Sequence, residues 1–229
     1  MDLIENNHPI KPESHWYYQE KFKHIFKSLT TYAPKFSTLC DVGAGTAPFS
    51  RQLAAIYPNK NFIAVDKYYT DEIIGKDIEG IKHQRFITPA EVYLLTDVLE
   101  HLENPKQILE EIGGQSHKGG LLIISVPAHM ILWSGHDVFL KHYRRYTRNN
   151  LLMELSCLDY ELIELKYIFN ILFLPVLIFR SITRNRITSN MKQHKFLLQL
   201  FFRIILKFDA LFQNRFPFGL SVYCVIKLK

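Results

Sequence analysis

Four short apolar segments set the strongest limit on how this chain can fold. Each is followed by residues with a helical pattern. They are STLCDV (37–42), NFIAVD (61–66), EVYLLTDV (91–98) and GGLLIISVP (119–127). Strands that are apolar on both faces are typical of a parallel sheet covered by helices on each side. Alternation of strands with helices is typical of α/β folds. With a weaker strand at 82–87, the pattern predicts an α/β domain on a mainly parallel sheet.

The last third of the chain follows a different pattern. The segments 160–169 (YELIELKYIF) and 220–229 (LSVYCVIKLK) alternate like strands, and the residues between them have helical character. Two late strands joined by a long connection predict an antiparallel pair that completes the sheet. We interpret the 229 residues as one domain, with an N-terminal helical lid at 1–35 and a helical apolar and basic insertion at 170–216.

The first apolar segment leads into a loop suited to a nucleotide, TLCDVGAGTAPFS (38–50). Glycine permits close backbone approach to a ligand, and the start of the next helix offers free N–H groups. A dinucleotide site uses similar parts but needs a third glycine where this chain has Pro48. Asp41, two residues before the first glycine, favours a cofactor with a cationic end, such as S-adenosylmethionine. Asp66, which closes the second strand, can accept hydrogen bonds from both ribose hydroxyls.

At these residues the chain resembles the class I S-adenosylmethionine-dependent methyltransferases. LCDVGAGTAPFS (39–50) is similar to their first motif and FIAVDKYY (62–69) to their second. LLTDVLEHLENP (94–105) is similar to the fourth-strand signature of a subgroup that includes ubiquinone-type and other small-molecule methyltransferases. The resemblance covers roughly residues 14–169 and the last strand. It implies a Rossmann-like seven-stranded sheet of order 3-2-1-4-5-7-6, with the last strand antiparallel and helices on both faces.

The resemblance also implies S-adenosylmethionine as cofactor and a set of residues that bind it. These are Asp41, Gly43, Ala44, Gly45, Asp66, Lys67, Thr88, Thr96 and Asp97. The chain departs from the family at two places. The usual third glycine is Ala47, and RFITPAEV (85–92) has no acid for the adenine before Glu91, so we expect backbone near Ile87 and Thr88 to contact it. Two other classes stay open: an NAD(P)-dependent oxidoreductase and a non-catalytic, membrane-associated scaffold.

The segment after the fifth strand, 125–155, is similar to a run in one methyltransferase subgroup and lies where such sheets bind ligands. Methyl transfer to a hydroxyl requires alignment of the acceptor and removal of its proton. We expect catalytic roles for His136, Asp137 and His142, with His136 beside Asp137 as an oriented base and His142 as a second candidate. We expect Arg144 and Arg145 to bind a carboxylate or phosphate, with Trp133 and Tyr146 as pocket walls. The alternative is structural: Asp137 pairs with Arg144 or Arg145 and holds the loop shut. His101 is expected to support the turn after the fourth strand.

Charge is distributed unevenly along the chain. Residues 141–229 hold 15 Lys and Arg against 5 Asp and Glu, whereas residues 1–140 hold 13 against 17. Within 170–216 the basic residues alternate with apolar ones, which favours contact with an anionic membrane surface. A helical cap on the sheet or a dimer interface is the alternative. Nucleic acid is disfavoured, because exposed polar residues and stacking platforms are missing from this segment.

The sequence therefore predicts an enzyme that O-methylates an amphipathic or lipid-linked small molecule, in the cytoplasm and peripherally at the inner membrane face. No apolar run reaches the ~18 residues of a membrane span, and the N-terminus does not resemble a secretory signal. Cys40, Cys157 and Cys224 lack metal-binding spacing, so we expect reduced thiols and no metal site. The acceptor, the methylated element and the oligomeric state stay open.

Overall fold

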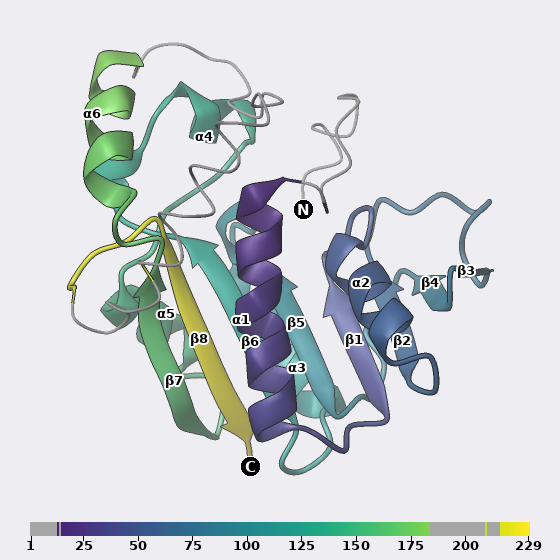
Figure 1. Ribbon diagram of the computed structural model, residues 1–229. Helices are drawn as coiled ribbons and strands as arrows, with labels where there is room; N and C mark the ends of the chain where they lie inside the picture. The colour runs from purple at the N-terminus through teal and green to yellow at the C-terminus, as the bar shows by residue number, and fades with distance from the viewer. Residues whose placement is uncertain (1–12, 14, 184–208, 210–215) are drawn as a thin grey trace.

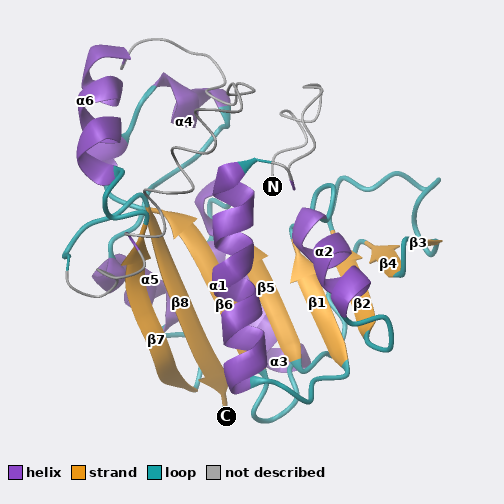
Figure 2. Cartoon of the chain, viewed as in Figure 1, coloured by secondary structure: helices purple, strands orange, loops and turns teal. Residues whose placement is uncertain are grey.

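The computed structural model describes residues 13, 15–183, 209 and 216–229. An eight-stranded sheet forms its centre, and helices cover both faces (Figure 1). Helices α1 (Trp16–Tyr32) and α2 (Pro48–Ile56) lie on one face, and α3 (Pro105–Gln115) and α5 (Arg148–Leu155) lie on the other (Figure 2). Each face has its own cluster of buried apolar side chains, so the sheet is the boundary between two cores.

The order of the strands is β3-β4-β2-β1-β5-β6-β8-β7. Their bounds are β1 (Thr38–Val42), β2 (Asn61–Val65), β3 (Asp77–Ile78), β4 (Ile81–Gln84), β5 (Val92–Thr96), β6 (Leu121–Pro127), β7 (Tyr160–Ile168) and β8 (Ser221–Leu228). Five neighbouring strands run parallel to one another: β4, β2, β1, β5 and β6. Strand β8 is antiparallel to both of its neighbours, β6 and β7. The predicted order of seven strands is confirmed.

The predicted number of strands was one too low. The additional strand, β3, has two residues and pairs antiparallel with β4 at the edge of the sheet. Both of its residues are exposed, so no apolar pattern marks it in the sequence. The central strands β5 and β6 are buried along their whole length, whereas the edge strand β7 is largely half-buried or exposed. This difference explains why the sequence pattern changes between the two parts of the chain.

Several short elements lie beyond the carboxyl ends of the parallel strands. These are η3 (Leu99–His101), η4 (Met130–Leu132), α4 (Gly135–Phe139) and α6 (Phe173–Thr183). Figure 1 shows α4 and α6 together above the end of the sheet, and α6 packs against η4. Of the predicted insertion, the structure describes residues 170–183, which include helix α6, and residues 209 and 216. Residues 184–208 and 210–215 of that insertion, and residues 1–12 and 14 of the predicted lid, lie outside the described residues.

Helix α1 packs on the sheet with one apolar side. Tyr18, Ile25 and Leu29 are buried in the same core as residues of β1 and β6, and the Ser28 hydroxyl lies 2.8 Å from that of Tyr223 on β8. The three cysteines are free thiols, with Cys40 and Cys224 buried. Among the described helices, none combines the length and apolar character needed to cross a membrane.

Candidate active site

A cavity of ≈ 650 Å³ lies at the carboxyl ends of the central strands. Its wall is formed by four of the segments that the sequence assigned to the cofactor: Gly43 after β1, Asp66 and Lys67 after β2, Ile87 after β4, and Asp97 after β5. His101 on η3 also lines it, as do Leu140, Lys141 and Tyr143 from the loop after β6. One cavity thus joins the predicted nucleotide loop to the loop that carries the predicted catalytic residues.

The glycine loop brings bare backbone to this cavity. Gly43 has a φ of +71°, and a Cβ atom placed on it would lie 2.6 Å from Cγ2 of Val98. Gly45, with a φ of +55°, donates its N–H to Asp66 at 3.0 Å. The other carboxylate oxygen of Asp66 accepts the N–H of Tyr68, also at 3.0 Å. Asp66 is therefore held at the wall by backbone donors on both sides.

Ala47 takes the place of the third glycine. It has a φ of 53° and a ψ of 44°, which is the left-handed conformation that glycine adopts without strain. Pro48 follows as the first residue of α2, where its missing N–H is not needed. The small alanine side chain fits, as expected from the sequence, but in a strained conformation.

Asp41 lies beneath this loop and not at the cavity. Its carboxylate is 3% exposed and accepts the Ser50 hydroxyl of α2 at 2.7 Å. Burial raises the pKa of Asp41 to about 6. The residues that line the cavity do not include Asp41, and the cofactor contact predicted for it stays a prediction. The carboxylates that line the cavity are those of Asp66, Asp97 and Glu111.

Asp97 holds a cation that the sequence did not predict. Nζ of Lys21, on α1, lies 2.6 and 2.5 Å from the two carboxylate oxygens of Asp97. The Lys21 side chain is 1% exposed, and its ammonium also lies 4.5 Å from the ring centre of Tyr17. Burial alone would lower the pKa of Lys21, but the Asp97 carboxylate outweighs it and raises the pKa above its ordinary value. Helical periodicity alone does not reveal a buried lysine, so this contact was missed.

The remaining predicted cofactor residues lie in or near the wall. The Lys67 ammonium lies over the ring of Tyr68, 4.9 Å from its centre. The Thr88 hydroxyl accepts the Gln84 amide at 3.0 Å and does not line the cavity, whereas its neighbour Ile87 does. Ala44 and Thr96 are buried, and the Thr96 hydroxyl has no hydrogen-bond partner among the described residues.

Asp137 is the centre of the loop after β6. It is fully buried on α4, and its carboxylate accepts the Ser134 N–H at 2.9 Å, Nε of Arg145 at 2.7 Å and NH1 of Arg180 at 3.0 Å. Nδ1 of His142 lies 3.0 Å from the same carboxylate. Burial would raise the pKa of Asp137, but the hydrogen bond from His142 and the two guanidinium groups hold it well below its usual value.

The Asp137 carboxylate orients the imidazole of His142, which is five residues further along the chain. We expected it to orient His136, its neighbour in the sequence. His136 is half-buried on α4 and does not line the cavity. Burial, together with the nearby Arg180 guanidinium, lowers the pKa of His136 to about 4. A weak, neutral imidazole at this place is a poorer base than the sequence suggested.

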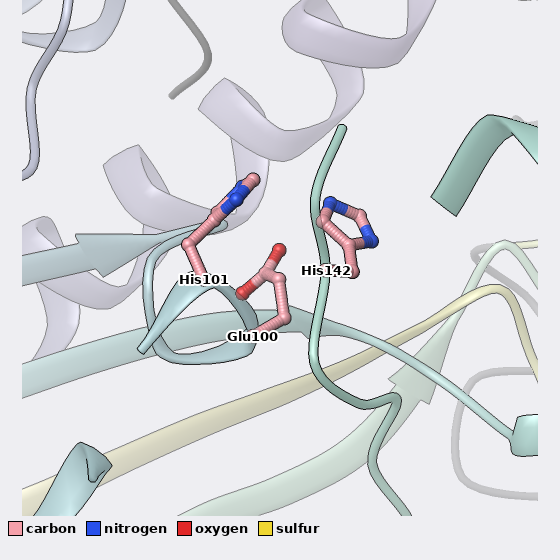
Figure 3. Close-up of side chains that lie close together, drawn as sticks. All are labelled: Glu100, His101 and His142. Atoms are coloured by element: carbon pink, nitrogen blue, oxygen red, sulfur yellow. The ribbon is translucent and has the colours of Figure 1, made fainter. Parts of the chain in front are cut away.

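Glu100, His101 and His142 form a cluster between η3 and the loop after β6, with the Glu100 carboxylate between the two imidazoles (Figure 3). Donor atoms of the three side chains lie within 4.8 Å of one another, and the two imidazole centres are 4.5 Å apart. Glu100 is 1% exposed, and neither of its oxygens has a hydrogen-bond partner among the described residues. Burial, reinforced by Asp97, raises the pKa of Glu100 to about 7.

The cluster has two consequences. Burial and the neighbouring His142 lower the pKa of His101 to about 3, so His101 is neutral at ordinary pH. One carboxylate and two imidazoles at this spacing could also hold a divalent cation; the absence of a metal stays a prediction. The sequence placed His101 at the turn after the fourth strand, where it is found, but did not single out Glu100.

Two residues predicted to bind the acceptor are buried inside the protein. The Arg145 guanidinium, 5% exposed, bonds to Asp137 and to the carbonyl of Ala128 at 3.0 Å. The Tyr146 hydroxyl donates to the carbonyl of Leu99 at 3.3 Å, and its side chain is 1% exposed. These bonds fasten the loop to η3 and to the residue after β6, as the structural alternative proposed for Arg145. Both residues also line a smaller cavity of ≈ 250 Å³, so their role in binding the acceptor stays a prediction.

Arg144 and Trp133 also lie away from the large cavity. Arg144 donates to the carbonyls of Leu102 and Glu103 and pairs with Glu154, and it lines a separate cavity of ≈ 250 Å³. Trp133 is half-buried at the end of η4. From this loop the large cavity instead receives Leu140, Lys141 and Tyr143, which the sequence did not assign.

Comparison with known proteins identifies one family and several solved structures with a similar fold. A sequence model of the family described as "Methyltransferase domain" matches residues 15–166. Among curated proteins, no sequence matches this chain. A solved putative sarcosine dimethylglycine methyltransferase from Galdieria sulphuraria is 10% identical with a TM-score of 0.58, over 92% of this chain and 86% of that one.

Two further structures share the fold. Coclaurine N-methyltransferase, bound to N-methylheliamine and S-adenosylhomocysteine, is 13% identical with a TM-score of 0.54, over 90% of this chain and 73% of that one. The N-methyltransferase NodS from Bradyrhizobium japonicum WM9, in complex with S-adenosylhomocysteine, is 11% identical with a TM-score of 0.52, over 94% and 89%. The chain spans only about half, 53%, of the length of two other matched proteins. At these identities the likeness shows the fold alone.

Proposed function

We propose, because this chain belongs to the methyltransferase domain family, that it transfers a methyl group from S-adenosylmethionine to an oxygen atom of a small amphipathic molecule. The family is one of methyltransferases and not of dinucleotide-dependent oxidoreductases, which removes that alternative. Beyond the family, we propose three points. They are the place of the cofactor in the large cavity, the base that acts on the acceptor, and the apolar character of the acceptor.

The chemistry of the cavity fits the cofactor. Asp66 at the wall offers a carboxylate to ribose hydroxyls. Residue 43 is a glycine because the backbone there lies too close to Val98 for a side chain to fit. Ile87 is an apolar surface for the adenine, and Asp97 is a carboxylate that already binds an ammonium group. S-adenosylmethionine supplies a methyl group that is activated by its sulfonium, so the protein has to align an acceptor and accept its proton.

The pair formed by Asp137 and His142 is our reason for proposing oxygen as the atom that receives the methyl group. A hydroxyl must lose its proton as the methyl group arrives, and a histidine held by a carboxylate suits that task near neutral pH. Since Nδ1 of His142 faces Asp137 at 3.0 Å, Nε2 is the nitrogen left to accept a proton. His142 is not itself among the residues that line the cavity, but its ring lies 4.5 Å from that of His101, which is, so we place the base directly behind the cavity wall.

The exposed apolar residues of α6 and of the neighbouring loop support an amphipathic acceptor. They are Met130, Ile131, Val138, Leu174, Ile178 and Ile182. Leu174, Ile178 and Ile182 follow one another at four-residue spacing along α6, and α6 packs against η4, which carries Met130 and Ile131. Exposed apolar patches mark binding surfaces. We therefore place the apolar part of the acceptor, or the membrane that contains it, on this side.

Calorimetry with S-adenosylmethionine tests the cofactor site. We expect binding by the wild-type chain, and loss of most of that binding in Asp66→Ala, because the carboxylate at the wall is gone. Lys60→Ala, a change on a loop that does not line the cavity, is the control. Binding of NAD in place of S-adenosylmethionine would overturn the proposal.

Two measurements test the acceptor. Incubation with S-adenosylmethionine carrying a labelled methyl group and a total lipid extract should produce one labelled species whose mass spectrum places the methyl group on oxygen. Label on nitrogen or carbon would contradict the choice of oxygen, and no label in any extract would favour a non-catalytic scaffold. Flotation with phosphatidylglycerol vesicles at low salt should carry the protein upward; a protein that stays at the bottom would rule out the membrane.

A further inference from the structure

We infer that Arg180 on α6 is a positioning residue for His142, an inference that rests on the proposed role of His142 as the base. The Arg180 side chain is 14% exposed and reaches from α6 into the loop after β6. Its NH1 donates to the carbonyl of Leu132 at 2.6 Å and to Oδ2 of Asp137 at 3.0 Å. A single guanidinium thus ties α6 to the end of η4 and to the carboxylate that holds the base.

The two oxygens of Asp137 have separate duties. Oδ1 lies 3.0 Å from Nδ1 of His142 and 2.7 Å from Nε of Arg145. Oδ2 accepts from Arg180 and from the Ser134 N–H. Because a carboxylate is planar, a partner that fixes Oδ2 also fixes the direction in which Oδ1 points. Removal of Arg180 leaves Oδ2 with the Ser134 N–H and Oδ1 with Arg145, so the carboxylate is held less firmly in the direction of His142.

The direction of Asp137 decides which nitrogen of His142 carries the proton. An ionised carboxylate can only accept, so Nδ1 must be the nitrogen that donates, and Nε2 is left as the acceptor. The other titratable groups that act on His142 are Glu100, His101 and His136. Two guanidinium groups against one carboxylate keep Asp137 ionised, which maintains this tautomer.

Helix α6 therefore has two functions at once. It exposes the apolar stripe of Leu174, Ile178 and Ile182, and through Arg180 it sets the tautomer of the base. A base that is correctly set only when α6 is packed against η4 links the binding of an apolar acceptor to the removal of its proton.

The test is NMR of the full chain with ¹⁵N-labelled histidine, whose ring nitrogen shifts report the tautomer directly. The His142 signals are those absent from His142→Gln. In the wild type we expect the Nδ1–H form. In Arg180→Met the ratio of the Nδ1–H to the Nε2–H form should fall roughly fivefold, which is the factor expected for the net contribution of one ordinary hydrogen bond. Arg180→Lys, which keeps a cationic donor, should restore most of the ratio.

The matched control is Arg148→Met. Arg148 lies at the start of α5 over the ring of Tyr167, 5.0 Å from its centre. Its removal should leave the His142 tautomer unchanged. An unchanged ratio in Arg180→Met would overturn the inference and leave Arg180 as a structural tie; if that variant does not fold, Arg180→Gln decides in the same way.

The outcome is separable from the proposed function. If His142→Gln keeps full methyl transfer to the labelled lipid acceptor while Arg180→Met changes the tautomer, the base is another residue and the coupling to α6 still stands. If His142→Gln loses transfer and the tautomer does not respond to Arg180, the base is correct and the coupling is wrong.

Discussion

Lys21 and Asp97 are 76 residues apart in the sequence, yet they form an ion pair with Nζ 2.5 and 2.6 Å from the two carboxylate oxygens, at the wall of the large cavity. The pair joins α1, on one face of the sheet, to the turn that follows β5. Helix α1 is therefore both part of the core and part of the site.

Removal of Lys21 should be costly. Lys21→Met leaves the Asp97 carboxylate without its partner in a mostly dry place, so the free energy of unfolding should fall by about 3 kcal/mol. Lys23→Met is the matched control, because the Lys23 side chain is 58% exposed and its pair with Glu20 should contribute less than about 1 kcal/mol. Urea unfolding measures both. A loss in Lys21→Met as small as that expected for Lys23→Met would mean that the buried pair adds no more stability than an exposed one.

A methyl group on Gly43 should damage the cofactor site as well as the fold. Gly43→Ala puts a Cβ atom 2.6 Å from Val98 and requires a φ of +71°. We expect S-adenosylmethionine affinity to fall by about tenfold or more, with a stability loss of about 1–3 kcal/mol. Gly75→Ala separates strain from crowding, since Gly75 has a φ of +75° and a Cβ atom placed on it would have no neighbour within 4 Å. Calorimetry should show unchanged affinity for Gly75→Ala; a loss of affinity there as large as in Gly43→Ala would refute the crowding argument.

Replacing Ala47 with glycine, the usual residue of the family at this position, should stabilise the protein. Ala47 has a φ of 53°, so Ala47→Gly relieves a conformation that costs an alanine about 1–2 kcal/mol, partly offset by the greater freedom of glycine in the unfolded chain. We expect a net gain of about 0.5–1 kcal/mol in urea unfolding. The same change inside α2, Ala54→Gly, should instead cost about 1 kcal/mol. A loss of stability in both variants would show that Ala47 is not strained.

Glu100 should make the protein less stable as pH rises. Its pKa in the folded protein is about 7, above the ordinary 4.5, so its favourable contribution is complete below about pH 4.5 and is lost as pH rises through 7. Glu100→Gln has no carboxyl to ionise, so it should match the wild type near pH 5 and exceed it by about 1–3 kcal/mol at pH 8.

The difference between these two stability curves isolates Glu100 from its neighbours. His101 and His136, with pKa values of about 3 and 4, act in the opposite sense, because their contribution is present above about pH 6.5 and lost as pH falls. Both variants contain these histidines, so their effect cancels. A pH-independent difference between Glu100→Gln and the wild type would show that Glu100 is ionised throughout.

The two histidines of the loop should differ in catalysis. His142→Gln removes the imidazole that Asp137 orients, and turnover of the labelled lipid acceptor should fall by about 10²-fold or more. His136→Gln should change turnover much less, because burial already lowers the pKa of His136 to about 4. The initial rate of label transfer at saturating S-adenosylmethionine measures both, and the reverse order would restore His136 as the base.

Local sequence predicted the parts of the fold that are locally determined. Buried strands such as β5 and β6 are apolar along their whole length, and the glycine loop with Asp66 has a characteristic spacing, so both were found from the sequence. The exposed, two-residue β3 has no such pattern.

The rest of the site depends on contacts between distant segments. The sequence pattern predicts that Lys21 lies on a helix and that Asp97 lies at the end of a strand. It does not reveal that the two side chains form an ion pair. In the loop after β6, the sequence brought Asp137 next to His136, but the helical turn of α4 directs the carboxylate to His142 and Arg145, and α6 adds Arg180 from 43 residues away. Side-chain direction, and not sequence adjacency, decided which imidazole became the candidate base.

The position of β8 has a consequence for synthesis of the chain. Residues 221–228 lie between β6 and β7 and pair with both of them. Until residues 221–228 have left the ribosome, β6 has an open edge and β7 lacks the strand it pairs with, even though both were made earlier. Open strand edges invite pairing with other chains, so the nascent protein needs protection, by a chaperone or by fast synthesis of the connection, until β8 has been made.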